Sequence, residues 1–197
     1  FCLRGRARDR DVVQTAYDTA GGTFGFELFD DVDPEALALR AARRACLMLG
    51  ADPAPTGRMP VVLSSEAGGT MIHEAVGHGL EADHIEKGMS TYCGRLNEQI
   101  AVPEITVVDD GTLPGKRGSA CVDDEGTPAG RTVLIDKGVL VRFLNDRRTA
   151  AKTGMAPTGN GRRESYQHKP VPRMTNALIA PGKRDPASIL AETDRGL

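Results

Sequence analysis

Three of the chain's four histidines lie within the fifteen residues from Thr70 to His84. A glutamate, Glu74, directly follows the first of them, His73. Imidazole nitrogens hold divalent metal ions, and a carboxylate beside such an ion can transfer protons. The composition of this stretch therefore indicates a metal site.

The spacing of the two best candidate ligands constrains the backbone that carries them. His73 and His78 are five positions apart, with the motif H-E-x-x-x-H. On a regular helix, residue i+4 is displaced by roughly 40° and residue i+5 by roughly 140°, so these two rings would diverge. Gly77 and Gly79 flank His78 and allow the backbone to relax, and a one-residue π-bulge would restore a shared face. We therefore predict a broken or bulged helix that carries both histidines.

Composition limits the class of protein. The chain has 197 residues, is 40% hydrophobic and 26% charged, and has a net charge of -2, which gives no electrostatic case for nucleic acid or an anionic membrane as partner. No apolar run approaches the ~20 residues that span a bilayer. The four cysteines show no C-x-x-C spacing and are typical of reduced thiols. We expect a cytoplasmic protein.

The predicted fold class is mixed α/β (α+β), in two parts. Residues 51–59 form a proline-rich connector, the best candidate boundary. Residues 1–50 are expected to be the C-terminal part of an N-terminal α/β domain, and residues 60–197 the first part of a β-rich domain that carries the histidine helix. The chain begins at Phe1 rather than Met and stops soon after a predicted helix, so we expect it to be part of a longer protein.

Apolar periodicity and turn residues predict the individual elements. In the first part, residues 1–20 show no interpretable pattern, residues 21–28 alternate like a strand, and a helix begins at Asp33 and ends at Gly50. Its expected core positions are Leu37, Ala41, Ala45 and Met48. In the second part we expect helices over 66–81, 146–154 and 185–194, strands over 60–65, 105–108, 119–122 and 177–180, and a hairpin over 132–144.

Several polar residues allow two interpretations. Asp123, Asp124 and Glu125 favour a turn over a metal cluster. Arg162 and Arg163 could hold a substrate carboxylate or backbone, or form structural salt bridges. The same uncertainty applies near the histidines: Glu81 could hold the second nitrogen of a ligand histidine or be a solvated acid, and His84 fits a loop better than a ligand position.

Five ordered blocks give a more specific signal. They are His73 to Asp83, Val107 to Thr112, Asp123 to Pro128, Pro157 to Ser165 and Pro172 to Asn176. Together they resemble the TldD/PmbA family, and the intact H-E-x-x-x-H motif resembles its TldD-type subunits.

The resemblance implies a zinc-dependent metallopeptidase that hydrolyses peptide bonds of unfolded or extended polypeptides. By position, His73 and His78 would be the Zn²⁺ ligands and Glu74 the general base. The family's third ligand is a cysteine beyond the end of this chain, so we expect these residues alone to be inactive. A partner subunit of the PmbA (TldE) type, which lacks the motif, is implied as well.

Two alternatives from other classes stay open. The chain could belong to a non-catalytic partner or scaffold subunit, or to a modulator that binds another protein, such as a toxin–antitoxin or topoisomerase component. Zinc stoichiometry of the complete protein would separate the first from a peptidase. Co-purification with a partner that stays intact would favour the second.

Overall fold

Local packing divides the chain into two units. The computed structural model describes all 197 residues, apart from the side chains of residues 66 and 67. The N-terminal unit comprises Phe1–Arg58 with Gly115–Arg117, and the histidine unit comprises Met59–Pro114 with Gly118–Leu197. Each unit has its own buried apolar residues.

The N-terminal unit is a hairpin packed on a helix. Strands β1 (Cys2–Asp9) and β2 (Val12–Thr19) pair antiparallel, and they are followed by α1 (Leu28–Asp31) and α2 (Pro34–Leu49). The predicted helix is confirmed: the Asp33 side chain accepts the backbone N–H of Glu35 at its start, and Gly50 follows its last turn. Leu37, Ala41 and Ala45 are buried.

Two expectations for this unit are wrong, and one of its elements was not predicted. The strand predicted over 21–28 is wrong, because these residues form turns leading into α1, and Phe26 is 89% exposed. Met48 is 38% exposed, since it lies in the last turn of α2. The hairpin itself was not predicted, because small residues such as Gly5 and Ala7 occupy its inward positions and hide the period of two.

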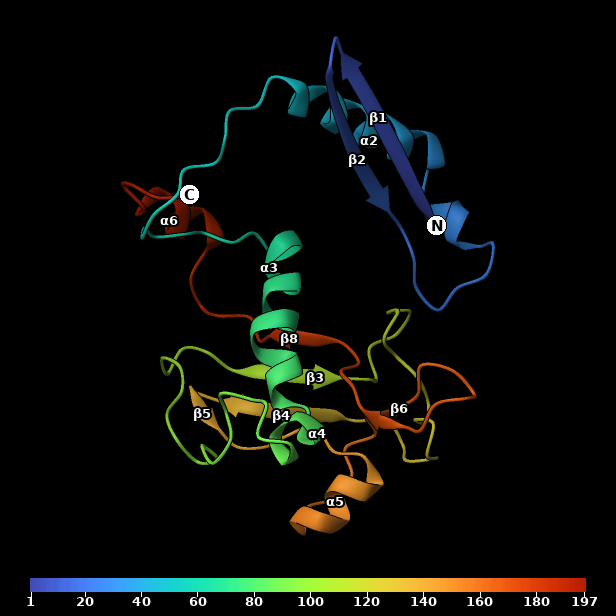
Figure 1. Ribbon diagram of the computed structural model, residues 1–197, viewed down its shortest axis with the longest axis vertical. Coiled ribbons are helices and arrows are strands. Elements are labelled where there is room, and N and C mark those ends of the chain that lie inside the picture. The colour runs from blue at the N-terminus through green and yellow to red at the C-terminus, as the bar shows by residue number, and fades with distance from the viewer. The chain divides into compact units, whose positions relative to one another are not determined.

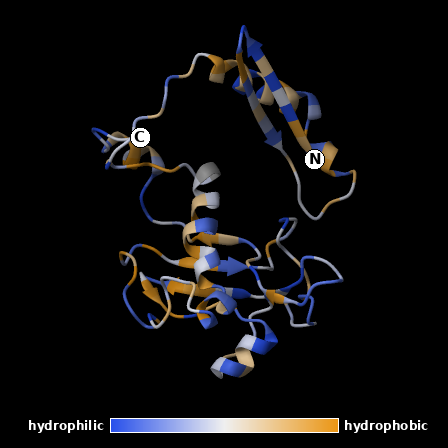
Figure 2. Ribbon diagram, in the orientation of Figure 1, coloured by the Kyte–Doolittle hydropathy of each residue, from blue (hydrophilic) through white to orange (hydrophobic). Residues whose placement is uncertain are grey.

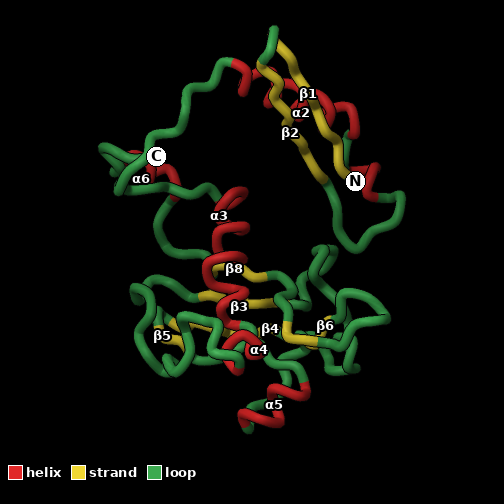
Figure 3. Tube along the Cα trace, viewed as in Figure 1, coloured by secondary structure: helices red, strands yellow, loops and turns green.

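The histidine unit is built on an antiparallel sheet (Figures 1 and 3). Its strand order is β5-β4-β3-β8, with β3 (Val107–Asp110), β4 (Arg131–Asp136), β5 (Val139–Leu140) and β8 (Ala177–Ile179). A separate pair joins β6 (Gly161–Arg162) to β7 (Val171–Pro172). The fold is therefore mixed α/β with antiparallel sheets, as predicted.

A helical stretch crosses this sheet. It consists of α3 (Ser65–Ile72), a π turn η1 (His73–Gly77), a 3-10 turn η2 (His78–Leu80) and α4 (Ala82–Glu86). Farther along the chain, α5 (Arg147–Thr153) and α6 (Pro186–Ala191) complete the unit. The core joins the stretch to the sheet through residues such as Leu80, Val107, Leu134, Leu140 and Leu144.

The sequence predicted several elements of this unit correctly. The hairpin turns at Lys137 and Gly138, which have φ angles of 47° and 81°. Helix α5 starts at a capping box formed by Asp146 and ends at Gly154 in the left-handed conformation. Strand β8 and helix α6 lie where their patterns placed them, within a few residues.

Three strand predictions need correction. Residues 60–65 form no strand, and Val61 and Leu63 are about half exposed. The region 119–122 contributes only an isolated bridge between Val122 and Pro128. The strand predicted over 105–108 lies two residues later and continues through buried acids, so β3 changes from hydrophobic to hydrophilic along its length (Figure 2).

Among the described residues, none of the helices combines the length and the apolar composition that crossing a bilayer requires.

Candidate metal centre

The predicted bulge is confirmed at the H-E-x-x-x-H motif. The backbone N–H of His78 donates to the carbonyl of His73, which is the five-residue step of a π turn. The two imidazole rings lie with their centroids 4.7 Å apart and their planes at 88°. One wide helical turn thus brings together two side chains that a regular helix would separate.

Glycine has a different role here from the one predicted. Gly77 has φ −57° and ψ −56°, an ordinary right-handed conformation, so no unusual backbone angle requires it. A Cβ at this position would instead lie 1.8 Å from Sδ of Met174. A Cβ at Gly79 would lie 2.7 Å from the ring of Tyr92. Both glycines therefore allow neighbouring side chains to approach the backbone closely.

The turn gathers a possible set of metal ligands. His73, Glu74 and His78 each offer one nitrogen or oxygen atom, and these atoms all lie within 4.8 Å of one another. Two imidazoles and a carboxylate are donors that zinc accepts, so the residues present fit that ion chemically. Their assignment as metal ligands and as catalytic base stays a prediction.

Glu81 orients the second histidine. Its side chain is fully buried, and its Oε2 lies 3.1 Å from Nδ1 of His78 and 3.0 Å from a guanidinium nitrogen of Arg173. A guanidinium can only donate, so this oxygen is an acceptor and His78 donates from Nδ1. Nε2 of His78 is then the nitrogen left for a metal. The interpretation of Glu81 as a solvated acid is therefore wrong, because its side chain is buried against His78.

A buried charge network surrounds Glu81. Desolvation raises the pKa of Glu81, while the hydrogen bond from His78 and the charge of Arg173 act in the opposite direction. Arg173 also lies 3.4 Å from the buried Asp83, which pairs with Lys87 at 3.1 Å. Arg173 therefore holds two buried carboxylates under the candidate centre, a function that periodicity alone did not indicate.

His84 supports the backbone of the site. It lies in α4, so the expected loop position is wrong. Its Nδ1 donates to the carbonyl of His78 over 2.8 Å. Atoms of Glu81, Asp83 and His84 also come within 4.8 Å of one another, but Arg173 and Lys87 already pair with the two carboxylates.

The turn predicted around Asp123 is confirmed. Oδ1 of Asp123 accepts the backbone N–H groups of Glu125 and Thr127, and its Oδ2 accepts that of Gly161. The carboxylate is therefore occupied in fixing the loop next to β6.

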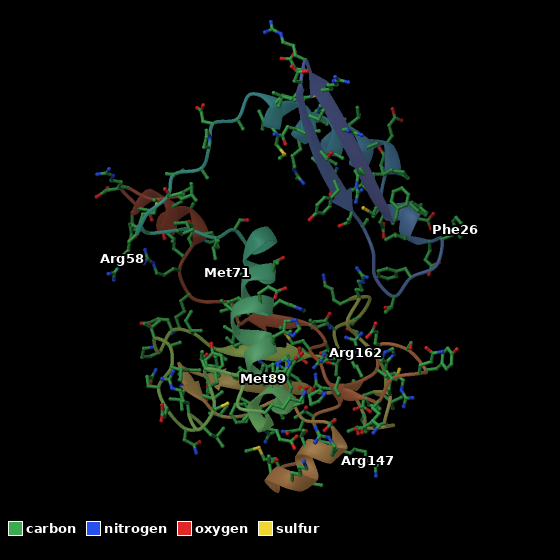
Figure 4. The ribbon with its side chains drawn as sticks, viewed as in Figure 1. Phe26, Arg58, Met71, Met89, Arg147 and Arg162 are labelled. Carbon is green, nitrogen blue, oxygen red and sulfur yellow. The ribbon has the colours of Figure 1, made fainter. Side chains whose placement is uncertain are left out.

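A cavity of about 550 Å³ opens beside the histidines. His73 and His78 line it together with Glu81, whereas Glu74 does not. Arg162, labelled in Figure 4, donates to the carbonyl of Met174 over 2.8 Å on another part of the wall. The remaining lining residues are Arg163, Glu164, His168, Lys169, Val171, Arg173 and Met174.

A buried aspartate fixes the segment that carries Arg173 and Met174. Asp109 of β3 accepts hydrogen bonds from the backbone N–H and hydroxyl of Thr175 and from the side-chain amide of Asn160, at 2.7–2.8 Å. Asp109, Asp110 and Gly111 are residue types typical of a turn, yet Asp109 is 1% exposed and belongs to β3. The block from Pro172 to Asn176 contributed to the family resemblance, but nothing in the sequence indicated that it lies beside the histidines.

Comparison with known proteins agrees with this arrangement. Residues 56–197 match the family model described as the PmbA/TldA metallopeptidase C-terminal domain. A metalloprotease TldD homolog of Haemophilus influenzae is 44% identical over 183 residues, covering 90% of this chain and 38% of the relative. A metalloprotease of Methanothermobacter thermautotrophicus is 42% identical over 180 residues, covering 91% and 39%. The chain thus spans less than half the length of these relatives.

Solved structures share the fold. A Thermotoga maritima protein described as a proposed modulator of a DNA gyrase superposes with a TM-score of 0.78 and 29% identity, over 99% of this chain and 43% of its own. TldE from Thermococcus kodakarensis superposes with a TM-score of 0.73 and 25% sequence identity, and the match covers 97% of this chain and 42% of TldE. With more than half of its residues matched by the family model, the chain belongs to the PmbA/TldD metallopeptidase family.

Proposed function

We propose that this chain contributes the histidine ligands and the base of a zinc peptidase that hydrolyses unfolded or extended polypeptides. The observation that carries the proposal is the π turn, which sets the rings of His73 and His78 4.7 Å apart beside Glu74. The metalloprotease names of the relatives support a metal at this place.

The side chains have separate roles in this chemistry. A zinc ion, when bound, supplies Lewis acidity and lowers the pKa of a water toward ~7. Glu74 accepts the proton of the attacking water and delivers it to the leaving amine. Glu81 holds His78 with Nδ1 protonated, which would leave Nε2 as the nitrogen available to bind the ion. Arg173 keeps Glu81 in place.

The ligand set needs one more group. Catalytic zinc sites commonly use three protein ligands and a water. Among the described residues, no cysteine belongs to the group formed by His73, Glu74 and His78. We therefore assign the third ligand to a cysteine of the complete protein outside these 197 residues, as the family resemblance implies.

Substrate and partner follow from the same assignment. The outer edge of β8, an edge strand of the four-stranded sheet, could pair with an extended peptide through its backbone, whereas the edge of β5 already bonds to residues 97–99. A folded substrate cannot present its backbone in this way. The structural likeness to TldE supports a second subunit of that type, in a cytoplasmic hetero-oligomer.

The substitution Glu74→Gln in the complete protein tests the mechanism. Zinc content should stay unchanged, while peptide hydrolysis should fall by roughly 10²–10⁴-fold because the proton acceptor is lost. Glu104→Gln, at an exposed glutamate outside the cavity, is the matched control and should retain full activity. Unchanged turnover in Glu74→Gln would exclude Glu74 as the base, and equal cleavage of folded and unfolded forms of one protein would exclude the proposed substrate class.

A second candidate is a non-catalytic modulator. It is favoured by the Thermotoga maritima structure, whose description concerns a DNA gyrase. Zinc stoichiometry of the complete protein distinguishes the two. A protein that binds no zinc and co-purifies with an intact topoisomerase would be a modulator rather than a peptidase.

A further inference from the structure

Unpaired cations line one part of the cavity beside the histidines. Four lining residues are cationic, and two, Glu81 and Glu164, are carboxylates. Arg173 pairs with Glu81 at 3.0 Å. The other three, Arg162, Arg163 and Lys169, form no ion pair with any described residue. Arg162 still acts through its charge on the buried Asp109, so the cations of the wall without a carboxylate partner among the described residues are Arg163 and Lys169.

The single free carboxylate of the lining does not cancel this charge. The Glu164 side chain is 83% exposed, and its Oε2 lies 3.9 Å from Nε2 of His168. A carboxylate so well solvated interacts weakly with the groups around it. A concave surface of one sign concentrates ligands of the opposite charge.

Two of the cations rest on fixed backbone. The N–H of Arg163 donates to Oδ2 of Asp124 over 2.8 Å, and its guanidinium reaches the carbonyl of the same residue at 3.5 Å. Arg162 donates to the carbonyl of Met174. Lys169 has no hydrogen-bond partner among the described residues, so its ammonium is available to a ligand.

The size and lining of the cavity restrict the ligand. A volume of about 550 Å³ fits a short stretch of peptide. Val171 and Met174 add an apolar surface to the charged wall. A planar carboxylate attached to such a peptide would satisfy both surfaces, since arginine binds carboxylates through parallel N–H donors.

We propose that this cavity selects polypeptide substrates by a carboxylate held at Arg163 and Lys169, close to the scissile bond. The inference rests on the proposed peptidase function. The carboxylate has two sources, the C-terminal α-carboxylate of a peptide or the side chain of an aspartate or glutamate within it. The residues act in substrate binding, so their loss raises KM or Kd.

The experiment measures binding and hydrolysis separately on the complete protein. Three fluorescently labelled peptides share one sequence with a single internal glutamate: the parent, a form with a C-terminal carboxamide, and a form with glutamine for that glutamate. Binding is followed by fluorescence anisotropy on wild type, on Arg163→Gln/Lys169→Gln, and on Lys183→Gln. Lys183 is an exposed lysine outside the cavity lining, and its substitution is the matched control.

We expect one of the two altered peptides to bind wild type roughly tenfold more weakly than the parent, which identifies the source of the carboxylate. The double variant should lose this difference, Lys183→Gln should retain it, and added salt should reduce it. Equal binding of all three peptides to wild type, or a preference that persists in the double variant, overturns the inference. A carboxylate preference without hydrolysis of any peptide would instead refute the peptidase proposal and leave the binding site standing.

Discussion

Substituting Gly77 by alanine should destabilise the histidine unit and weaken its hold on a metal. The added Cβ would lie 1.8 Å from Sδ and 2.9 Å from Cε of Met174, far inside van der Waals contact. Met174 is 4% exposed and packs in the core as well as lining the cavity, so moving its side chain would disturb other contacts. Either its side chain repacks or the π turn moves away, and the second response separates His73 from His78.

The magnitude follows from two opposing contributions. Overpacking a well-packed core costs about 1–3 kcal/mol. Alanine in a right-handed helical position gains roughly 0.5–1 kcal/mol over glycine, and the backbone angles of Gly77 allow that gain. The net loss should lie between about 0 and 2.5 kcal/mol, with a middle value of about 1 kcal/mol. Gly69→Ala in α3 isolates the favourable contribution, because a Cβ at Gly69 meets no atom within 4 Å and should be neutral or stabilising.

Urea unfolding followed by far-UV circular dichroism compares the two variants, and zinc affinity of the complete protein provides the second measurement. Gly77→Ala should lower the midpoint and the affinity, whereas Gly69→Ala should lower neither. Adding Met174→Ala to Gly77→Ala should cost less than the sum of the two single changes, since the small side chain removes the clash. Equal stability of the two glycine variants would refute the close-packing role of Gly77.

Two further predictions concern the scaffold. Burial raises the pKa of Asp109 above its ordinary value of 3.8. The folded protein therefore binds this proton more tightly than the unfolded chain does. The stability that the protonated carboxyl contributes is lost as the pH rises above about 3.8. The stability of wild type relative to Asp109→Asn should therefore fall as the pH rises above about 4 in urea titrations; a rise would contradict the direction of the shift. Asp146→Ala removes the acceptor of the Thr149 N–H at the start of α5 and should lower the free energy of unfolding by about 0.5–2 kcal/mol. Asp146→Ser keeps a side-chain acceptor at this position and should retain most of that stability. Equal stability of the two variants would argue against the cap.

The elements that the sequence predicted correctly are those whose signals are local. Helix α2 carries its own cap at Asp33, its periodic apolar face and its terminal glycine. The hairpin of β4 and β5 turns at Lys137 and Gly138, where the glycine accepts a positive φ. The bulge at the histidines was also predictable, because five-residue spacing on one helix allows only a few geometries that bring both rings together.

The failures share a different cause, which is that the deciding contacts come from distant parts of the chain. Asp109 and Asp110 precede a glycine and read as a turn, yet they extend β3 because Thr175, Asn160 and Asn176 bond to them. Residues 60–65 have the composition of a strand but form none, and the backbones of Pro60 and Val62 bond instead to Leu197. Arg173 belongs to the site only because β7 brings it under Glu81, which no local pattern could indicate.

These distant contacts explain how an exposed histidine, His73, and a half-buried one, His78, keep a defined geometry. Asp109 fixes Thr175, and the two residues before it reach the site: Met174 packs against Gly77, and Arg173 holds Glu81, which holds His78. The buried carboxylate of Asp109 thus positions the π turn through Met174, and His78 through Arg173 and Glu81. Catalytic and metal-binding groups need such support from residues that cannot move. The arrangement implies that Asp109 should influence zinc affinity without touching the ion, through the same two contacts that Gly77→Ala disturbs directly.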